Sequence, residues 1–312
     1  MSEFKLIMLS AMYENGGNTT HRMFDGHPQL FVYPFESQVG TGFANDPFSS
    51  LVPIRYRWPE FPADASGEQA YEMFWDEELK TLLRVPQRSK FRDCGLEMDE
   101  ADRRRKFVEL CAGKPVCRAT FVEAYYRSAF EAWKNYDRTG EECATVGYNP
   151  VQLLDTDKIL RDFPRGHVVH VVRNPWAGFA DTLRRPFPLS LERYSWLWSV
   201  CQHLALTYRR KYPDRFHLLR FEDLAASPAD TMRRALEQLG LPMSDHCLAP
   251  SFNRKRLEQV YPWGTIRTPT PQANVATANA LTREQKERLL VEASVMISAM
   301  GYEEFYAKHL AG

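Results

Sequence analysis

Short, mostly apolar runs alternate with amphipathic stretches along the chain, and this pattern predicts the secondary structure. Buried strands are predicted at 4–9, 30–33, 167–172 and 216–221. Helices are predicted at 19–25, 70–83, 99–111, 119–136, 191–212, 228–239 and 282–300. Two of these helices begin after a capping residue, Ser227 or Thr282, and end before a glycine, Gly240 or Gly301.

The order of the elements near the N-terminus is strand, glycine-containing loop, helix and strand, which is the start of a βαβ unit. Strands and helices continue to alternate, so we expect an α/β fold with a mostly parallel central sheet flanked by helices on both faces. We expect a single domain over 1–312, with an irregular, aromatic-rich insertion around 40–100. Ligands bind such sheets at the carboxyl ends of the strands, so the segments that follow the strands are the first candidates for a site.

Composition narrows the possible partners. The chain has 312 residues, and its 40 Lys and Arg balance 40 Asp and Glu, so no global charge would recruit nucleic acid or an anionic membrane. No run approaches the ~18 apolar residues of a membrane span, and we expect no signal peptide before the first strand. The six cysteines form no CxxC pair and the histidines form no ligand pattern. We therefore expect reduced thiols, a cytoplasmic location and no structural metal.

The turn after the first predicted strand has the chemistry of an anion site. Gly16 and Gly17 permit a tight turn and a close backbone approach to a ligand, and Asn18, Thr19 and Thr20 open a helix. The unpaired N–H groups and the dipole at a helix N-terminus attract anions. No Gly-Lys-Ser/Thr follows, so this is not a Walker A loop, which argues against a P-loop kinase-like enzyme. The alternative is an ordinary strand-to-helix turn.

A second candidate follows the strongest predicted strand. Arg173 comes directly after 167–172, so its side chain is expected in the ligand crevice at the carboxyl edge of the sheet. A guanidinium group can bind phosphate through two parallel hydrogen bonds. The alternative is a surface arginine that pairs with an acidic neighbour.

Together these segments resemble the sulfotransferase family. The stretch 16–28 resembles the family's 5′-phosphosulfate loop and the following helix, and 170–185 resembles its 3′-phosphate motif. Residues 221–224, Phe-Glu-Asp-Leu, resemble its Tyr-Glu-Asp-Leu segment, and 147–150 lie where many members have Gly-Glu-Lys-Thr-Pro. The order and spacing agree from residue 4 to about residue 302.

The resemblance implies a P-loop-like fold with a modified phosphosulfate loop, and a metal-free enzyme. Such an enzyme moves a sulfuryl group from 3′-phosphoadenosine 5′-phosphosulfate to a hydroxyl of a small-molecule or carbohydrate acceptor. It implies a general base at Glu36. His21 is a second candidate, because the pKa of histidine suits a base, and its alternative role on a helix is to pack or to brace the loop. The donor contacts that the resemblance implies are Asn15, Gly16, Gly17, Asn18, Thr19, Thr20, Arg173, Thr182, Phe221 and, in a late loop at 261–267, Arg267.

The chain departs from the family pattern at three positions, and the first two motivate an alternative, a nucleotide-binding protein of the same fold that has lost catalysis. Members usually carry Lys or Arg just before the first loop glycine, where this chain has Glu14 or Asn15. The family's serine, eight residues after the arginine, is Asp181 here. An Asp that faces a phosphate would be repulsive, so either the neighbouring Thr182 is the ligand or the pocket differs. Tyr148 stands where Lys is common.

The stretch 55–58, Arg-Tyr-Arg-Trp, either lines an acceptor pocket or forms a surface loop.

Overall fold

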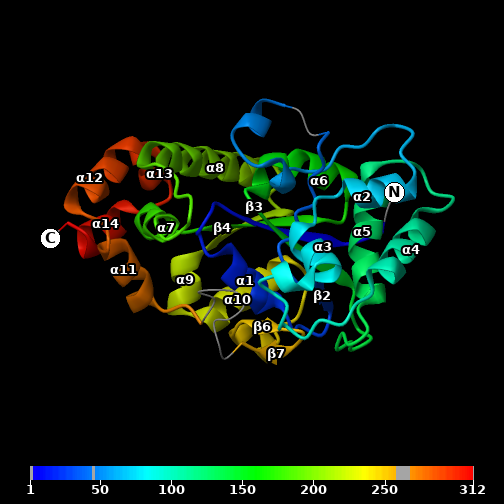
Figure 1. The fold of residues 1–312 in the computed structure, drawn as a ribbon. Helices are drawn as coiled ribbons and strands as arrows, with labels where there is room; N and C mark the ends of the chain where they lie inside the picture. The colour runs from blue at the N-terminus through cyan, green and yellow to red at the C-terminus, as the bar shows by residue number, and fades with distance from the viewer. Residues whose placement is uncertain (1–2, 44–45, 258–267, 312) are drawn as a thin grey trace.

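The computed structural model describes residues 3–43, 46–257 and 268–311 (Figure 1). A sheet of five parallel strands lies at its centre, in the order β2-β3-β1-β4-β5. The predicted α/β class with a mostly parallel sheet is confirmed. The strands are β1 (Leu6–Ala11), β2 (Leu30–Val32), β3 (Ala144–Pro150), β4 (His167–Val172) and β5 (Phe216–Arg220).

Helices cover both faces of the sheet, with α8 along one face and α1 and α10 along the other (Figure 1). Leu6 and Met8 of β1 belong to the first core cluster, whereas Ile7 and Leu9 belong to the second. This alternation explains the continuous apolar run, because each face of a strand covered on both sides needs apolar residues. The helices are α1 (Gly17–Phe24), α2 (Gly67–Met73), α3 (Glu77–Arg84), α4 (Glu100–Cys111), α5 (Arg118–Ala132), α6 (Thr156–Asp162), α7 (Pro175–Thr182), α8 (Leu191–Lys211), α9 (Phe221–Ala226), α10 (Pro228–Gln238), α11 (Pro271–Asn279), α12 (Arg283–Glu292), α13 (Ser294–Ala299) and α14 (Glu303–His309).

Several predicted boundaries were wrong. The helix expected at 70–83 is two helices, because the backbone of Asp76 between them has a φ of 41°. The helix expected at 282–300 is divided at Ala293, and that expected at 119–136 ends at Ala132. The strand expected at 216–221 ends at Arg220, because Phe221 begins α9. A short antiparallel pair, β6 (Ser251–Phe252) and β7 (Lys255–Arg256), was not expected.

A buried polar network ties the 40–100 segment to the sheet. The Asp76 carboxylate accepts hydrogen bonds from the hydroxyls of Tyr33 and Tyr125, both at 2.8 Å, and from Arg103 at 2.5 Å. The backbone N–H of Asp76 donates to the carbonyl of Gln38 at 3.0 Å. A buried arginine and carboxylate need such full pairing, since either one alone would be strongly destabilising. The network therefore fixes α3 and α4 against the chain that leaves β2.

In the described part of the chain, no helix combines the length and apolarity needed to cross a membrane. The same residues contain no cluster of three or more His, Cys, Asp or Glu side chains able to hold a metal ion.

Candidate active site

A cavity of about 540 Å³ opens at the carboxyl edge of the sheet. The turn after β1, the segments after β2 and β4, the end of β3 and the start of α9 meet there, as expected for an open parallel sheet. It is lined by Tyr13, Glu14, Gly16, Gly17, Asn18, Thr19, Glu36, Tyr56, Lys90, Tyr148, Pro150, Arg173, Asp181, Arg184, Arg185, Phe221, Pro269, Thr270, Ala273, Asn274 and Thr277.

Neighbouring aromatic rings leave no space for a side chain at either loop glycine. Gly16 has a φ of 84°, and a Cβ there would lie 2.2 Å from Cδ2 of Phe221. A Cβ on Gly17 would lie 2.4 Å from Cε2 of Tyr148. Any side chain at either position would displace a ring, so the backbone at the start of α1 remains open to the cavity. The N–H groups of this first helical turn can therefore meet an anion.

Asn15 and Thr20 brace this loop and do not line the cavity. Asn15 is fully buried, and its amide donates to the carbonyl of Tyr13 at 2.8 Å and to the hydroxyl of Tyr194 at 3.1 Å. Its side-chain oxygen accepts the backbone N–H of Arg173 at 3.3 Å, which joins the loop to the end of β4. The Thr20 hydroxyl donates to the carbonyl of Gly16 at 3.0 Å.

Arg173 lies in the cavity wall, held from three sides. Its Nε donates to the side-chain oxygen of Asn274 at 2.7 Å, and its Nη1 donates to the carbonyl of Glu14 at 2.9 Å. The guanidinium carbon lies 5.0 Å from the centre of the Phe221 ring, close enough for a cation–π contact. The side chain is thus fixed beside the glycine loop.

Asp181, the acidic residue that follows β4, is paired with two arginines. Asp181 Oδ2 accepts from Arg173 at 2.7 Å, and its Oδ1 lies 3.1 Å from Arg184. Thr182 is fully buried, and its hydroxyl donates to the carbonyl of Phe179 at 2.7 Å. The structure therefore places Asp181, and not Thr182, in the cavity wall. Arg267 lies outside the described residues.

Glu36 faces the glycine loop from the other side of the cavity. Its Oε1 accepts a hydrogen bond from the Asn18 amide at 3.2 Å, and its backbone N–H donates to Glu78 Oε2 at 3.1 Å. Glu78 is also paired with Lys90 at 2.7 Å. Burial and the neighbouring Glu36 carboxylate raise the pKa of Glu78 to about 7.

His21 is buried behind the cavity. Its ring lies 5.6 Å from the ring of Tyr148, and Arg22 Nη2 lies 3.1 Å from its nitrogens. Burial and the Arg22 charge hold the pKa of His21 well below its usual value. The ring is therefore neutral, and His21 is not among the residues that line the cavity.

Tyrosine rings form the wall near Glu36. Tyr13 and Tyr56 lie with ring centres 6.0 Å apart, and Tyr148 lines the same cavity. Burial raises the pKa of Tyr148 well above its usual value, so its hydroxyl stays protonated. Of the 55–58 stretch, Tyr56 lines the cavity. Arg57 is instead buried and bound to Asp155 through two hydrogen bonds of 2.8 Å.

Comparisons with known proteins identify the family of this chain. A family model described as the sulfotransferase family matches residues 16–245, which include the glycine loop, Glu36 and Arg173. The chain belongs to the sulfotransferase family. In a comparison with curated protein sequences, none matches this sulfotransferase significantly.

Two solved structures share the fold over nearly the full length of both chains. The sulfotransferase domain from the Synechococcus PCC 7002 olefin synthase aligns with a TM-score of 0.60 at 17% identity, covering 97% of this chain and 96% of that one. The sulfotransferase domain from the curacin biosynthetic pathway aligns with a TM-score of 0.55 at 13% identity, covering 96% of this chain and 99% of that one.

Sequence reasoning missed several residues that line the cavity of this sulfotransferase. Arg184 and Arg185 follow α7, and two adjacent arginines just beyond the β4 motif were a signal that could have been used. Lys90 comes from the 40–100 segment and Asn274 from α11, and neither position has a sequence signal.

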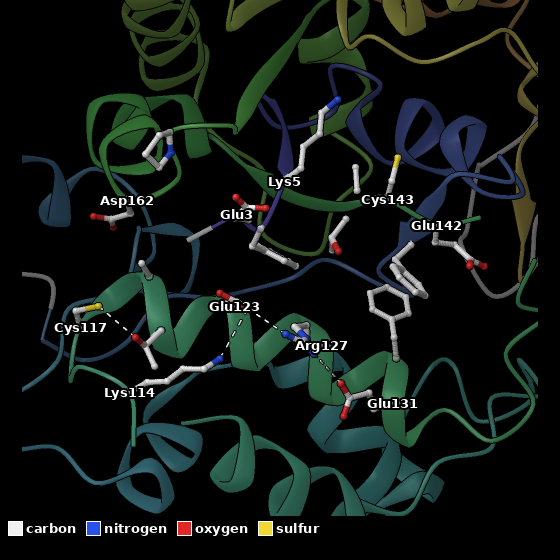
Figure 2. A pocket seen from close by; sticks show the side chains of 18 of the residues that line it. Glu3, Lys5, Lys114, Cys117, Glu123, Arg127, Glu131, Glu142, Cys143 and Asp162 are labelled. Carbon is white, nitrogen blue, oxygen red and sulfur yellow. Dashed lines mark hydrogen bonds and ion pairs between the residues drawn. The ribbon is translucent and has the colours of Figure 1, made fainter. Parts of the chain in front are cut away.

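A second cavity of the sulfotransferase, about 850 Å³, lies at the opposite edge of the sheet (Figure 2). Lys5 just before β1, the start of β3 and one side of α5 line it. Some of its charged side chains pair with each other: Arg127 lies 3.2 Å from Glu123 and 3.6 Å from Glu131. It contains neither the glycine loop nor a strand's carboxyl end, so the smaller cavity is the candidate active site.

Proposed function

We propose that this sulfotransferase moves a sulfuryl group from 3′-phosphoadenosine 5′-phosphosulfate to a hydroxyl of a small-molecule or carbohydrate acceptor. The observation that supports this most is that one cavity contains the glycine loop, Arg173 and Glu36. The loop and the N-terminus of α1 are suited to the 5′-phosphosulfate, and Arg173 is suited to the 3′-phosphate.

In this proposal Glu36 is the general base. The acceptor oxygen attacks sulfur in line with the phosphate oxygen that leaves, so one S–O bond forms as the other breaks. The acceptor proton passes to the Glu36 carboxylate, which Asn18 orients toward the loop. The negative charge that develops on the departing phosphate is stabilised by the loop N–H groups. Tyr13 and Tyr56 would flank the acceptor.

Donor recognition is tested by calorimetry with adenosine 3′,5′-bisphosphate, the desulfated product, and with 5′-AMP. We expect clearly tighter binding of the bisphosphate, because Arg173 gains a charge-assisted contact with the 3′-phosphate. Equal affinity for the two nucleotides would refute this assignment. Transfer is tested by incubating the protein with donor labelled in the sulfuryl group and a panel of alcohols, phenols and sugars.

A second candidate is a nucleotide-binding protein of this fold without turnover. The carboxylates of Glu14 and Asp181 in the cavity wall favour it, because both reduce the positive charge available to the donor. Binding of the bisphosphate with no sulfated product from any acceptor class would select this candidate.

A further inference from the structure

The glycine loop of this chain provides no positive side chain. Residues 13–20 include one acid, Glu14, and neither Lys nor Arg. A phosphosulfate over the N-terminus of α1 carries more negative charge than the helix dipole can balance, since the dipole amounts to roughly half a unit charge. A cation from elsewhere in the chain must therefore approach the loop.

Among the described residues, four cationic side chains line the cavity, and three of them have a close carboxyl partner. Lys90 lies 2.7 Å from Glu78. Arg173 lies 2.7 Å from Asp181, and Arg184 lies 3.1 Å from the same carboxylate. The fourth, Arg185, is held more loosely.

Arg185 lies directly beside the loop. Its Nε is 3.4 Å from Oε1 of Glu14, longer than a normal N–H···O hydrogen bond. Its guanidinium carbon lies 5.4 Å from the centre of the Tyr13 ring. The side chain is 38% exposed, so it can turn toward a ligand without breaking a packed core.

We propose that Arg185 is the cation that binds the 5′-phosphosulfate of the donor, and that Glu14 and Tyr13 hold it beside the loop beforehand. This inference rests on the proposed function. Arg185 takes the place of the absent loop cation and neutralises the charge that develops on the phosphate oxygen as its bond to sulfur breaks. A guanidinium can bind the oxygens of such a group through two parallel hydrogen bonds.

The state of Glu14 supports this exchange of partners. Burial raises the pKa of Glu14, although the charge of Arg185 acts in the opposite direction. An incoming anion raises it further, which weakens the hold of Glu14 on Arg185 when the donor arrives. The release of Arg185 from Glu14 and its contact with the donor are thus coupled.

The test compares the affinities of single variants for three nucleotides by calorimetry. Arg185→Gln should weaken the binding of adenosine 3′,5′-bisphosphate by about 10- to 150-fold, the usual effect of a lost hydrogen bond to a charged group. It should leave adenosine 3′-monophosphate unchanged, because that ligand lacks the 5′ group. Arg173→Gln should show the converse pattern: its affinity for the bisphosphate should fall and its affinity for 5′-AMP should not. Arg161→Gln, in the cavity at the opposite edge, is the matched control and should bind all three normally.

A charge relocation provides the second measurement. Glu14→Lys combined with Arg185→Gln returns a cation to the loop itself and should recover much of the lost affinity for the bisphosphate. The proposed role of Arg185 is wrong if Arg185→Gln binds the bisphosphate normally, or if its affinities for the bisphosphate and for the 3′-monophosphate fall equally. The proposed function stands in either case. If the wild type itself does not bind the bisphosphate, the proposed function fails.

Discussion

The side-chain amide of Asn18 donates a hydrogen bond of 3.2 Å to the carboxylate of Glu36. Asn18 belongs to the first turn of α1 and Glu36 follows β2, so this bond joins the candidate base to the N-terminal end of the helix. The carboxylate therefore faces the place where the proposed donor presents its sulfur.

Replacement of Glu36 should lower the rate of sulfuryl transfer and leave the donor affinity unchanged. Glu36→Gln keeps nearly the same size and can still hydrogen-bond Asn18, so we expect normal folding and normal donor affinity. The kcat should fall by about 10²–10⁴, the usual contribution of a positioned base. Glu77→Gln is the matched control, because that carboxylate is about half exposed and pairs with Arg55. A near wild-type rate in Glu36→Gln would show that the base is elsewhere.

Removal of the Arg173 side chain should weaken donor binding specifically. We expect Arg173→Ala to cost about 1.5–3 kcal/mol of affinity for adenosine 3′,5′-bisphosphate, the size of a hydrogen bond to a charged group. Asp181 then loses one of its two arginines, and Arg184 remains to pair with it. Calorimetry gives the affinity and circular dichroism checks the fold. An unchanged dissociation constant would exclude Arg173 from the donor site.

The contact between Gly17 and Tyr148 can be tested by adding a methyl group at position 17 and then removing the ring at position 148. Gly17→Ala places a Cβ 2.4 Å from the Tyr148 ring, so we expect a loss of about 1–3 kcal/mol in the free energy of unfolding and weaker nucleotide binding. Gly17→Ala combined with Tyr148→Ala should recover part of the nucleotide affinity. Gly42→Ala is the control, because no described heavy atom beyond its two chain neighbours lies within 4 Å of its added Cβ. Equal nucleotide affinity in the single and double variants would argue against a steric cause.

Glu78 should make stability depend on pH. Burial and Glu36 raise its pKa from 4.5 in the unfolded chain to about 7 in the folded protein. The folded state then binds this proton more tightly, so the contribution of Glu78 is complete below about pH 4.5 and is lost as pH rises through about 7. In urea unfolding, the stability of the wild type relative to Glu78→Gln should be lower at pH 8 than at pH 5. The same difference at both pH values would contradict the raised pKa.

Four of the strands could be predicted because each is a short apolar run. β3 was missed, because Gly147, Asn149 and Pro150 interrupt its pattern. The polar side chain of Asn149 is satisfied within the folded protein: it accepts the backbone N–H of the distant Gln38 at 2.9 Å and donates to Gln152, three residues further along the chain, at 2.7 Å. A strand with polar side chains satisfied in this way has no local signal that separates it from a loop.

The candidate site, like the sheet, could be predicted only in part. Gly16, Arg173 and Glu36 each follow a strand, and the parallel sheet brings such positions together, so their placement in one cavity follows from topology. The orientation of side chains on a helix depends on its exact start, and this decides that Asp181 faces the cavity while Thr182 is buried. The sequence of the β4 motif alone could not give that rotation.

The two sides of the cavity come from different parts of the fold. The glycine loop and Arg173 are extensions of adjacent strands at the centre of the sheet, whereas Tyr56 and Lys90 come from the 40–100 segment. That segment is attached to the chain after β2 through Asp76, Tyr33 and Arg103. A chimeric protein that exchanges this segment, keeps the buried anchor and leaves the strand extensions intact would therefore change the wall formed by Tyr56 and Lys90 and leave the glycine loop and Arg173 in place.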